Sequence, residues 1–170
     1  MSPASVALVT LFSLSTQLSL VNGCQDFWTS FGGHCYRYVG KHVRWTEAEA
    51  ICTGFGDAHL VSIHSQEEFD FVYDLWKESR DDVANTQFVH QGLWTGLTDK
   101  DSEGTFKYTD GSAKDYDAFA HGEPSDRKGD QDYVHIWDRP GYEPFWNDAQ
   151  NWHKFQVMCK QSCLPYLISM

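Results

Sequence analysis

Five cysteines restrict the folds open to this chain of 170 residues more than any other feature. They are Cys24, Cys35, Cys52, Cys159 and Cys163, and they lie in two groups toward opposite ends of the sequence. In an oxidising compartment four of them form two disulfide bonds and one is left over, with three possible pairings for any four. The arrangement predicts a domain whose two ends are held together, with one odd cysteine.

The first 23 residues resemble a secretory signal peptide, which would place the cysteines in such a compartment. They contain no Lys, Arg, Asp or Glu, and residues 6–14 form an apolar run of signal-peptide length. Val21 and Gly23 are small residues, as cleavage before Cys24 requires. The alternative is a membrane anchor, but the run is interrupted by Ser13, Ser15, Thr16, Gln17 and Ser19. We therefore predict a signal peptide at 1–23, secretion and no insertion into a membrane.

The composition is that of one globular domain with an acidic surface. Hydrophobic residues make up 41% of the sequence, and the length fits a single domain. The 24 acidic residues outnumber the 13 Lys and Arg, which gives a formal net charge of -11. This balance opposes binding to nucleic acid or anionic lipid, and it is compatible with binding of cations.

Two helices are indicated in the first half of the chain. Residues 45–52 place their apolar side chains on one face. Ser65 followed by Glu68 is a capping box, which opens a second helix. The apolar stripe of that helix, at three-to-four spacing, consists of Phe69, Val72, Tyr73 and Trp76.

Short strands are indicated in four places, at 60–63, 93–97, 133–137 and 155–160. Gly96 lies inside the second strand, where a glycine permits the close approach of another backbone. Residues 98–132 are rich in Gly, Asp, Ser and Lys and form a long loop, which in a compact domain is usually functional. This order predicts an α+β domain whose first and last strands lie close together, joined by a cysteine pair.

Seven short motifs resemble, in the same order, those of the C-type lectin domain family. They cover nearly all of residues 24–160 and are CQDFWTSFGGHCYRY, WTEAEAIC, AHLVSIHSQEE, LWTGLTD, GEPSD, FWND and FQVMC. The resemblance is greatest to small secreted lectins of invertebrates. It implies a carbohydrate-recognition domain at 24–160 and a C-terminal tail at 161–170. It also implies a double-loop fold with two helices, short antiparallel strands and a long loop shaped by calcium.

In this family a Glu-Pro-Asn or Gln-Pro-Asp tripeptide with a cis proline binds a calcium ion that in turn binds sugar. The tripeptide here is Glu123-Pro124-Ser125. Calcium takes roughly 6–8 oxygen ligands, and two vicinal sugar hydroxyls fill the positions that the protein leaves open. The resemblance implies that the protein ligands are Glu123, Ser125, Gln131, Asn147 and Asp148. Serine replaces an amide residue and Gln131 a glutamate, so we expect weaker calcium binding than in a standard member.

Many members of the family bind an auxiliary calcium ion beside the first. The resemblance places its ligands on Asp99, Glu103, Asp126 and Asp132. The alternative is that Asp99 and Asp126 only cap turns. We favour the metal, because four oxygen-bearing residues occur at the spacing of the family.

The resemblance also implies the disulfide pairing, Cys24 with Cys35 and Cys52 with Cys159. Cys163 then has no partner within the domain, and it lies in an apolar tail. A leftover cysteine in a secreted protein suggests pairing between chains, so we predict a disulfide-linked homodimer that agglutinates cells. The alternative is a free thiol on a frayed terminus.

Trp137 and Tyr142 lie between the long loop and the WND motif, where an exposed ring can stack on a sugar. One further bridge of the family is missing, and Tyr133 and Asn151 occupy its two positions. The alternative for Trp137 and Tyr142 is therefore that their rings fill the space of that bridge.

The leading hypothesis is a secreted, calcium-dependent lectin that is not an enzyme. The sequence offers no G-x-S-x-G or other nucleophile context. We expect galactose-type glycans, because the Asn that usually goes with mannose is absent and the apolar face of galactose can stack on an aromatic ring. The alternatives are a mannose-type lectin, and a C-type lectin-like domain that binds protein or another surface without sugar. The second alternative rests on the changes at Ser125 and Gln131.

Overall fold

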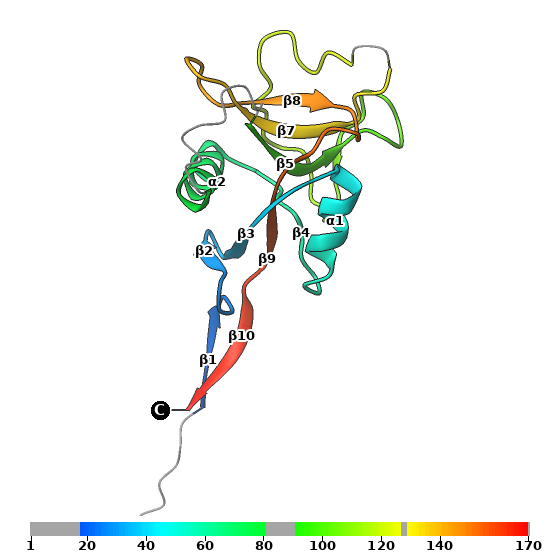
Figure 1. The fold of residues 1–170 in the computed structure, drawn as a ribbon. Coiled ribbons are helices and arrows are strands. Elements are labelled where there is room, and N and C mark those ends of the chain that lie inside the picture. The colour runs from blue at the N-terminus through cyan, green and yellow to red at the C-terminus, as the bar shows by residue number, and fades with distance from the viewer. Residues whose placement is uncertain (1–17, 81–90, 127–128, 170) are drawn as a thin grey trace, which may run out of the picture.

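The structure, a computed structural model, describes residues 18–80, 91–126 and 129–169 (Figure 1). The apolar run at 6–14, part of the predicted signal peptide, lies outside these residues. In the described part of the chain, no helix is both long and apolar enough to cross a bilayer.

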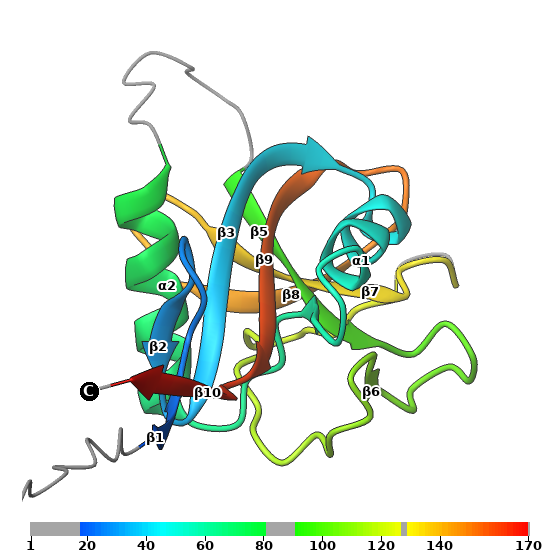
Figure 2. The ribbon, with the colours of Figure 1, turned by 90° about the horizontal axis from the view of Figure 1, so that it is seen from below.

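The two helices begin close to where the sequence predicted. Helix α1 spans Trp45–Thr53 and helix α2 spans Gln66–Ser79. The hydroxyl of Ser65 accepts the backbone N–H of Glu68 at 3.2 Å, which satisfies an N–H group that has no partner within the helix. Viewed from below, the helices lie on either side of the central strands β3 and β9, which span His34–Val43 and Phe155–Ser162 (Figure 2).

Within the described residues, eight strands form one mixed sheet. Six of them lie in the order β2-β3-β9-β5-β7-β8, while β4 pairs with β9 and β6 with β5. The remaining six bounds are Thr29–Phe31 for β2, His59–Leu60 for β4, Gln91–Thr98 for β5, Lys107–Tyr108 for β6, Tyr133–Asp138 for β7 and Phe145–Ala149 for β8. The α+β prediction is confirmed, but the strands are not all antiparallel. Strands β5 and β9 run parallel, and the long loop and the β7–β8 hairpin provide the extended connection that a parallel pair needs.

The predicted strand at 60–63 is mostly an extended segment, because β4 ends at Leu60. Beyond it, the Val61 N–H donates to the Met158 carbonyl at 3.0 Å and the Val61 carbonyl accepts the Gly96 N–H at 2.9 Å. The segment therefore lies between β9 and β5, with single hydrogen bonds to each. A Cβ atom on Gly96 would lie 2.8 Å from the Leu60 carbonyl oxygen, which explains why the strand needs a glycine there.

The core consists of two clusters of buried side chains, and each helix contributes to one of them. The apolar face of α1 joins Trp94 and Phe155 of the sheet. The apolar face of α2 joins a cluster that contains Trp146 of β8. The helices therefore fix the sheet strands, β7 and β8 included, from which the candidate site is built.

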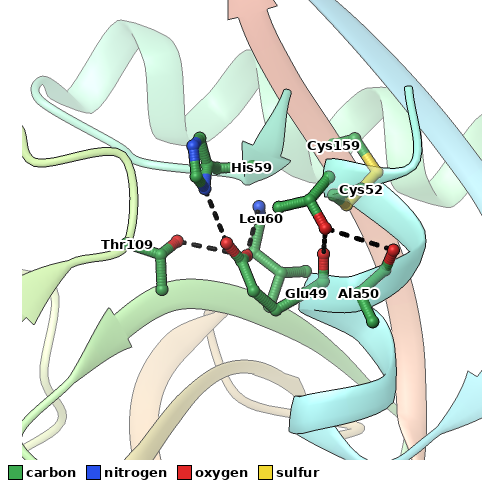
Figure 3. The surroundings of a disulfide bond; sticks show 8 residues. Glu49, Ala50, Cys52, His59, Leu60, Thr109 and Cys159 are labelled. Carbon is green, nitrogen blue, oxygen red and sulfur yellow. Dashed lines mark hydrogen bonds and ion pairs between the residues drawn. A yellow bond between two sulfur atoms is a disulfide. The ribbon is translucent and has the colours of Figure 1, made fainter. Parts of the chain in front are cut away.

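A disulfide bond between Cys52 and Cys159 joins α1 to β9 (Figure 3). The predicted cysteine pair thus links a helix to the last strand of the sheet, not two strands. Beside it the Glu49 carboxylate contacts three neighbouring groups, the His59 ring at 2.6 Å, the Leu60 N–H at 2.9 Å and the Thr109 hydroxyl at 3.1 Å.

Strands β1 (Leu18–Gly23) and β10 (Leu164–Ser169) form a separate antiparallel pair that extends away from the sheet (Figure 1). These are the first and last strands of the described residues. The first and last strands that the sequence predicted, at 60–63 and 155–160, also meet, because β4 pairs with β9 and Leu60 lies opposite Cys159. Strand β1 contains the last six residues of the predicted signal peptide. Cleavage before Cys24 would therefore remove β1 and leave β10 without this partner.

Candidate functional site

The tripeptide lies against strand β8, and its Glu123-Pro124 peptide bond is cis. The carboxylate of Asp148 in β8 accepts two backbone N–H groups of this segment, from Ser125 at 2.9 Å and from Asp126 at 2.6 Å. Asp148 is completely buried, so these hydrogen bonds compensate for a charge that is otherwise costly to bury. They hold the Glu-Pro-Ser segment at the end of β8.

Two amide side chains bond to one main-chain oxygen, that of Asp148. The Asn147 amide donates to the main-chain carbonyl of Asp148 at 2.7 Å, and the Gln131 amide donates to that oxygen at 3.1 Å. The Asn147 amide also lies 3.2 Å from a ring nitrogen of His135 on β7. Four of the residues predicted to bind the sugar-site calcium therefore lie together, Ser125, Gln131, Asn147 and Asp148. The fifth, Glu123, is two residues from Ser125, across the cis proline.

A second group of carboxylates lies where the long loop leaves and rejoins the sheet. Asp99 follows β5 and Asp132 precedes β7, and the Asp99 N–H donates to the Asp132 carbonyl at 3.2 Å. One carboxylate oxygen of Asp99 accepts the Gly104 N–H at 2.9 Å, so Asp99 does cap a turn. Its other oxygen, Oδ1, is buried and accepts no hydrogen bond from the residues that the structure describes.

The carboxylates of this second group repel one another. Glu103 is exposed, but partial loss of hydration raises the pKa of its carboxyl, and the negative charges of Asp99 and Asp126 raise it further. Burial also raises the pKa of Asp132, together with the charges of Asp99, Asp126 and Asp130. The four residues predicted for the auxiliary ion are thus close enough to interact electrostatically; they are Asp99, Glu103, Asp126 and Asp132.

Both groups offer oxygen ligands, which hard cations such as Ca²⁺ prefer. In the auxiliary group a divalent cation would relieve the mutual repulsion and coordinate the buried Asp99 Oδ1. The sugar-site group has two carboxylates, Glu123 and Asp148, and Asp148 already accepts two N–H groups. The chemistry of both donor sets suits calcium, and the electrostatic attraction for a cation is stronger at the auxiliary group.

A cavity of about 200 Å³ opens beside the sugar-site group. It is lined by three residues of that group, Gln131, Asn147 and Asp148, and by aromatic side chains that include Trp137 and Phe155. Trp137 therefore shares a cavity with the predicted calcium ligands.

Tyr142 lies in the turn between β7 and β8 and is 60% exposed. The guanidinium of Arg139 lies 4.5 Å from the centroid of its ring and 5.7 Å from that of Trp137. Tyr142 does not line the cavity. The sequence predicted the same stacking role for Trp137 and Tyr142, but the two rings have different surroundings.

Neither of these rings fills the space of the missing bridge. Tyr133, at one of its positions, packs its own ring 4.7 Å from that of Trp45. Asn151, at the other position, accepts the Thr46 N–H at 3.3 Å. Trp137 lies toward the opposite end of β7 from Tyr133, opposite Phe145 in the hairpin, so the structure contradicts that alternative.

The bridges Cys24–Cys35 and Cys52–Cys159 are both present, and Cys163 is a half-buried free thiol. The Sγ atom of Cys163 lies 3.5 Å from that of Cys35 and 3.9 Å from that of Cys24. The odd cysteine thus lies against the N-terminal bridge.

Sequence reasoning missed His135 and Phe155. Their rings stack with centroids 4.2 Å apart, and both line the cavity. A Cβ atom on Gly92 of β5 would lie 2.7 Å from the Phe155 ring, so the ring packs on bare backbone. The alternation of β7 places His135 on the same face as Trp137, and this alternation was the available signal.

Comparisons with known proteins agree with this geometry. The family model described as "Lectin C-type domain" matches residues 41–161. The chain is 36% identical over 138 residues to "Alpha-N-acetylgalactosamine-specific lectin" of Patiria pectinifera, covering 79% of this chain and 78% of that protein. It is 37% identical over 118 residues to "Echinoidin" of Heliocidaris crassispina, covering 64% of this chain and 77% of that protein.

Among solved structures, the C-type lectin CEL-I from Cucumaria echinata superposes with a TM-score of 0.72 at 30% sequence identity. The match covers 88% of this chain and 100% of CEL-I. Since the family model spans most of the chain, including the tripeptide, both carboxylate groups and β8, the chain belongs to the C-type lectin domain family.

Proposed function

We propose that this protein is a secreted lectin that binds galactose-type glycans through calcium. The observation that carries the proposal is the convergence of Ser125, Gln131 and Asn147 on the buried Asp148, next to the cavity that Trp137 lines. Calcium held there keeps open positions for two vicinal sugar hydroxyls. The side chains that hold the ion also exchange hydrogen bonds with those hydroxyls.

The family supports the broader part of this function. C-type lectins are non-enzymatic carbohydrate-binding proteins that are generally calcium-dependent. The chain is accordingly a carbohydrate-binding protein, and the expectation that it is not an enzyme is confirmed by its family.

Two features of the site, Ser125 and the Trp137 ring, support a preference for galactose-type sugars. Ser125 lacks the fixed carbonyl and NH₂ arrangement of the Asn that goes with mannose in this family. Galactose has an axial 4-hydroxyl and exposes a continuous apolar C–H face, which stacks on the Trp137 ring at the cavity. The name of the relative from Patiria pectinifera gives that lectin a sugar of the galactose series, which supports the same choice.

The auxiliary group is proposed to bind a second calcium ion that shapes the long loop. Its ligands would be Asp99, Glu103, Asp126 and Asp132. Asp126 follows Ser125 directly, so an ion held there also fixes the segment that carries the sugar-site ligands.

We also propose that the protein is secreted and forms a covalent dimer. Cleavage before Cys24 releases the domain, and a disulfide bond through Cys163 links two copies. Two weak sites on one molecule raise avidity and allow cells to be cross-linked. Electrophoresis with and without reductant tests this part, because a monomer-sized band in both lanes would remove the dimer.

A glycan array probed with calcium and again with chelator tests the central proposal. We expect signal on galactose-terminated glycans only with calcium. Competition with lactose and with mannose then tests the specificity, and stronger inhibition by mannose would make this a mannose-type lectin. A blank array under both conditions would leave the second alternative, a lectin-like domain that recognises protein or another surface.

A further inference from the structure

Three cysteine sulfurs form a cluster beside the end of β9. Cys24 and Cys35 are bonded to each other, and the free thiol of Cys163 lies 3.5 Å from Cys35 Sγ and 3.9 Å from Cys24 Sγ. The cluster lies outside the candidate sugar site, and glycan recognition does not use it. In thiol–disulfide exchange a thiolate attacks a sulfur of a disulfide bond, so a thiol in van der Waals contact with such a bond is close enough to react with it.

We propose that this cluster is a site of thiol–disulfide exchange within the chain. The thiolate of Cys163 attacks Cys35 Sγ, the Cys35–Cys163 bond forms, and the Cys24–Cys35 bond breaks. Cys24 leaves as a thiolate and takes up the proton that Cys163 gave to solvent. One disulfide bond and one thiol are present before and after, so the step needs no oxidant or reductant.

Burial decides which sulfur is attacked. Cys35 is 0% exposed, whereas Cys24 is half-buried. Attack on Cys35 leaves the negative charge on Cys24, where water reaches it, while attack on Cys24 would place the charge on a buried atom at a high cost. The His34 carbonyl oxygen lies 3.8 Å from Cys24 Sγ, where it accepts a hydrogen bond from the new thiol.

The approach requires a small movement of Cys163. Its two sulfur distances are similar, so the thiol lies beside the S–S bond and must rotate toward the axis of that bond before it attacks. Cys163 directly follows β9, and a backbone hydrogen bond to the Gly33 carbonyl, 3.1 Å long, attaches it there. A residue at the end of a strand can make this rotation without disturbing the sheet.

The exchange has a consequence for assembly. The odd thiol passes between Cys163 in the tail and Cys24 near the other end of the chain. Either residue then becomes available to bond a second copy, so covalent dimers form through both positions.

Alkylation followed by peptide mapping tests the proposal on the protein as a secreting host exports it. Iodoacetamide is added to the monomer fraction across a pH series, and mass spectrometry locates the label. We expect label on both Cys163 and Cys24, with the rate of labelling at both positions rising with pH because the thiolate is the reacting form. In the dimer fraction we expect interchain bonds at both positions.

Two controls make the result specific. The Cys52–Cys159 bond is buried, so it must remain unlabelled in the same sample. Cys163→Ser removes the attacking sulfur, and Cys24 must then stay unlabelled. Cys24→Ser must form a Cys35–Cys163 bond with no reactive thiol, provided near-UV circular dichroism shows a native fold.

The labelling pattern of the parent protein tests the exchange even if a variant does not fold. Label on Cys163 alone in the monomer fraction, across the whole pH series, would overturn the exchange whether or not dimers form. So would label on Cys24 that persists in Cys163→Ser. Loss of glycan binding would bear on the proposed function and leave this outcome untouched.

Discussion

The Asp148 carboxylate accepts the backbone N–H of Ser125 at 2.9 Å and so attaches the Glu-Pro-Ser segment to strand β8. We expect Asp148→Ala to abolish calcium-dependent sugar binding, because it removes a charged metal ligand and the acceptor of two N–H groups. Hydrogen bonds to charged groups contribute about 1.5–3 kcal/mol, so the sugar affinity falls by at least about tenfold even before the metal is lost.

Glu123→Gln is the companion variant, because it removes a charge at the same site and keeps the shape. Titration calorimetry with lactose should find sugar binding lost in both variants. Asp148→Ala should also lower the free energy of unfolding, because Asp148 is buried and bonded to two N–H groups. Undiminished affinity in either variant, or in parent protein with excess chelator, would contradict the assignment of the site.

Calcium should stabilise the protein through the carboxylates around Asp99. Ligand at about 100 times its dissociation constant adds about 2.7 kcal/mol to the free energy of unfolding. Asp99→Asn should reduce the number of calcium ions bound, measured by calorimetry, from two to one. Asp101→Asn changes an exposed carboxylate of the same turn and is the matched control. Equal calcium numbers in Asp99→Asn and Asp101→Asn would remove the auxiliary site.

Trp137 and Tyr142 should differ in their effect on sugar affinity. Trp137 lines the cavity with three predicted calcium ligands, whereas Tyr142 is 60% exposed outside it. A stacking contact is worth about 1 kcal/mol by analogy with aromatic pairs, so Trp137→Ala should weaken lactose binding about fivefold. Tyr142→Ala should leave it nearly unchanged. The opposite order, measured by competition, would transfer the stacking role to Tyr142.

A buried ion pair between Glu68 and Lys160 should control the stability of the fold. The two charged atoms lie 2.5 Å apart, and the Tyr36 hydroxyl donates to the same oxygen of Glu68 at 2.5 Å. Removal of one partner of a buried pair costs about 3–5 kcal/mol, so Glu68→Ala should lower the unfolding free energy in urea by about that amount. Glu78→Ala, on the exposed side of α2, is the control and should have little effect.

The same pair predicts the response to acid. Burial acts to raise the pKa of Glu68, but the hydrogen bonds from Lys160 and Tyr36 outweigh it, and the pKa lies below its usual value. The folded state therefore binds this proton less readily than the unfolded state. The stabilisation is present above the ordinary glutamate pKa of about 4.3 and is lost as the pH falls through the lowered value. Urea unfolding across this range should be less dependent on pH in Glu68→Ala than in the parent.

Local sequence signals predicted both helices and the strands β5, β7 and β9, because capping and periodicity act over a few residues, but they missed the long strand β3 and the edge strand β8. Ser65 and the stripe of α2 are examples, and Gly96 even indicated the close approach of Leu60. Candidate ligands could be predicted because short motifs mark the family, and the structure places Ser125, Gln131 and Asn147 at Asp148.

Contacts between segments that are far apart in the sequence could not be predicted from local signals. No local pattern places Lys160 beside Glu68, 92 residues away, or Cys163 against the bridge at Cys35, 128 residues away. The distinction between Trp137 and Tyr142 depends on where the β7–β8 hairpin packs. These relations arise from the order of strands in the sheet, which sequence periodicity does not determine.

Strand β8 is an edge strand of the sheet, so only one of its two edges pairs with another strand. The long loop covers that edge: the Trp146 N–H donates to the Ala118 carbonyl at 2.8 Å, and the Trp146 carbonyl accepts the Ala120 N–H at 3.3 Å. An uncovered edge strand is a template for pairing with other chains and for aggregation. The loop that carries the tripeptide thus also caps the sheet, and a sequence that alters sugar recognition in this loop must keep the protein soluble as well.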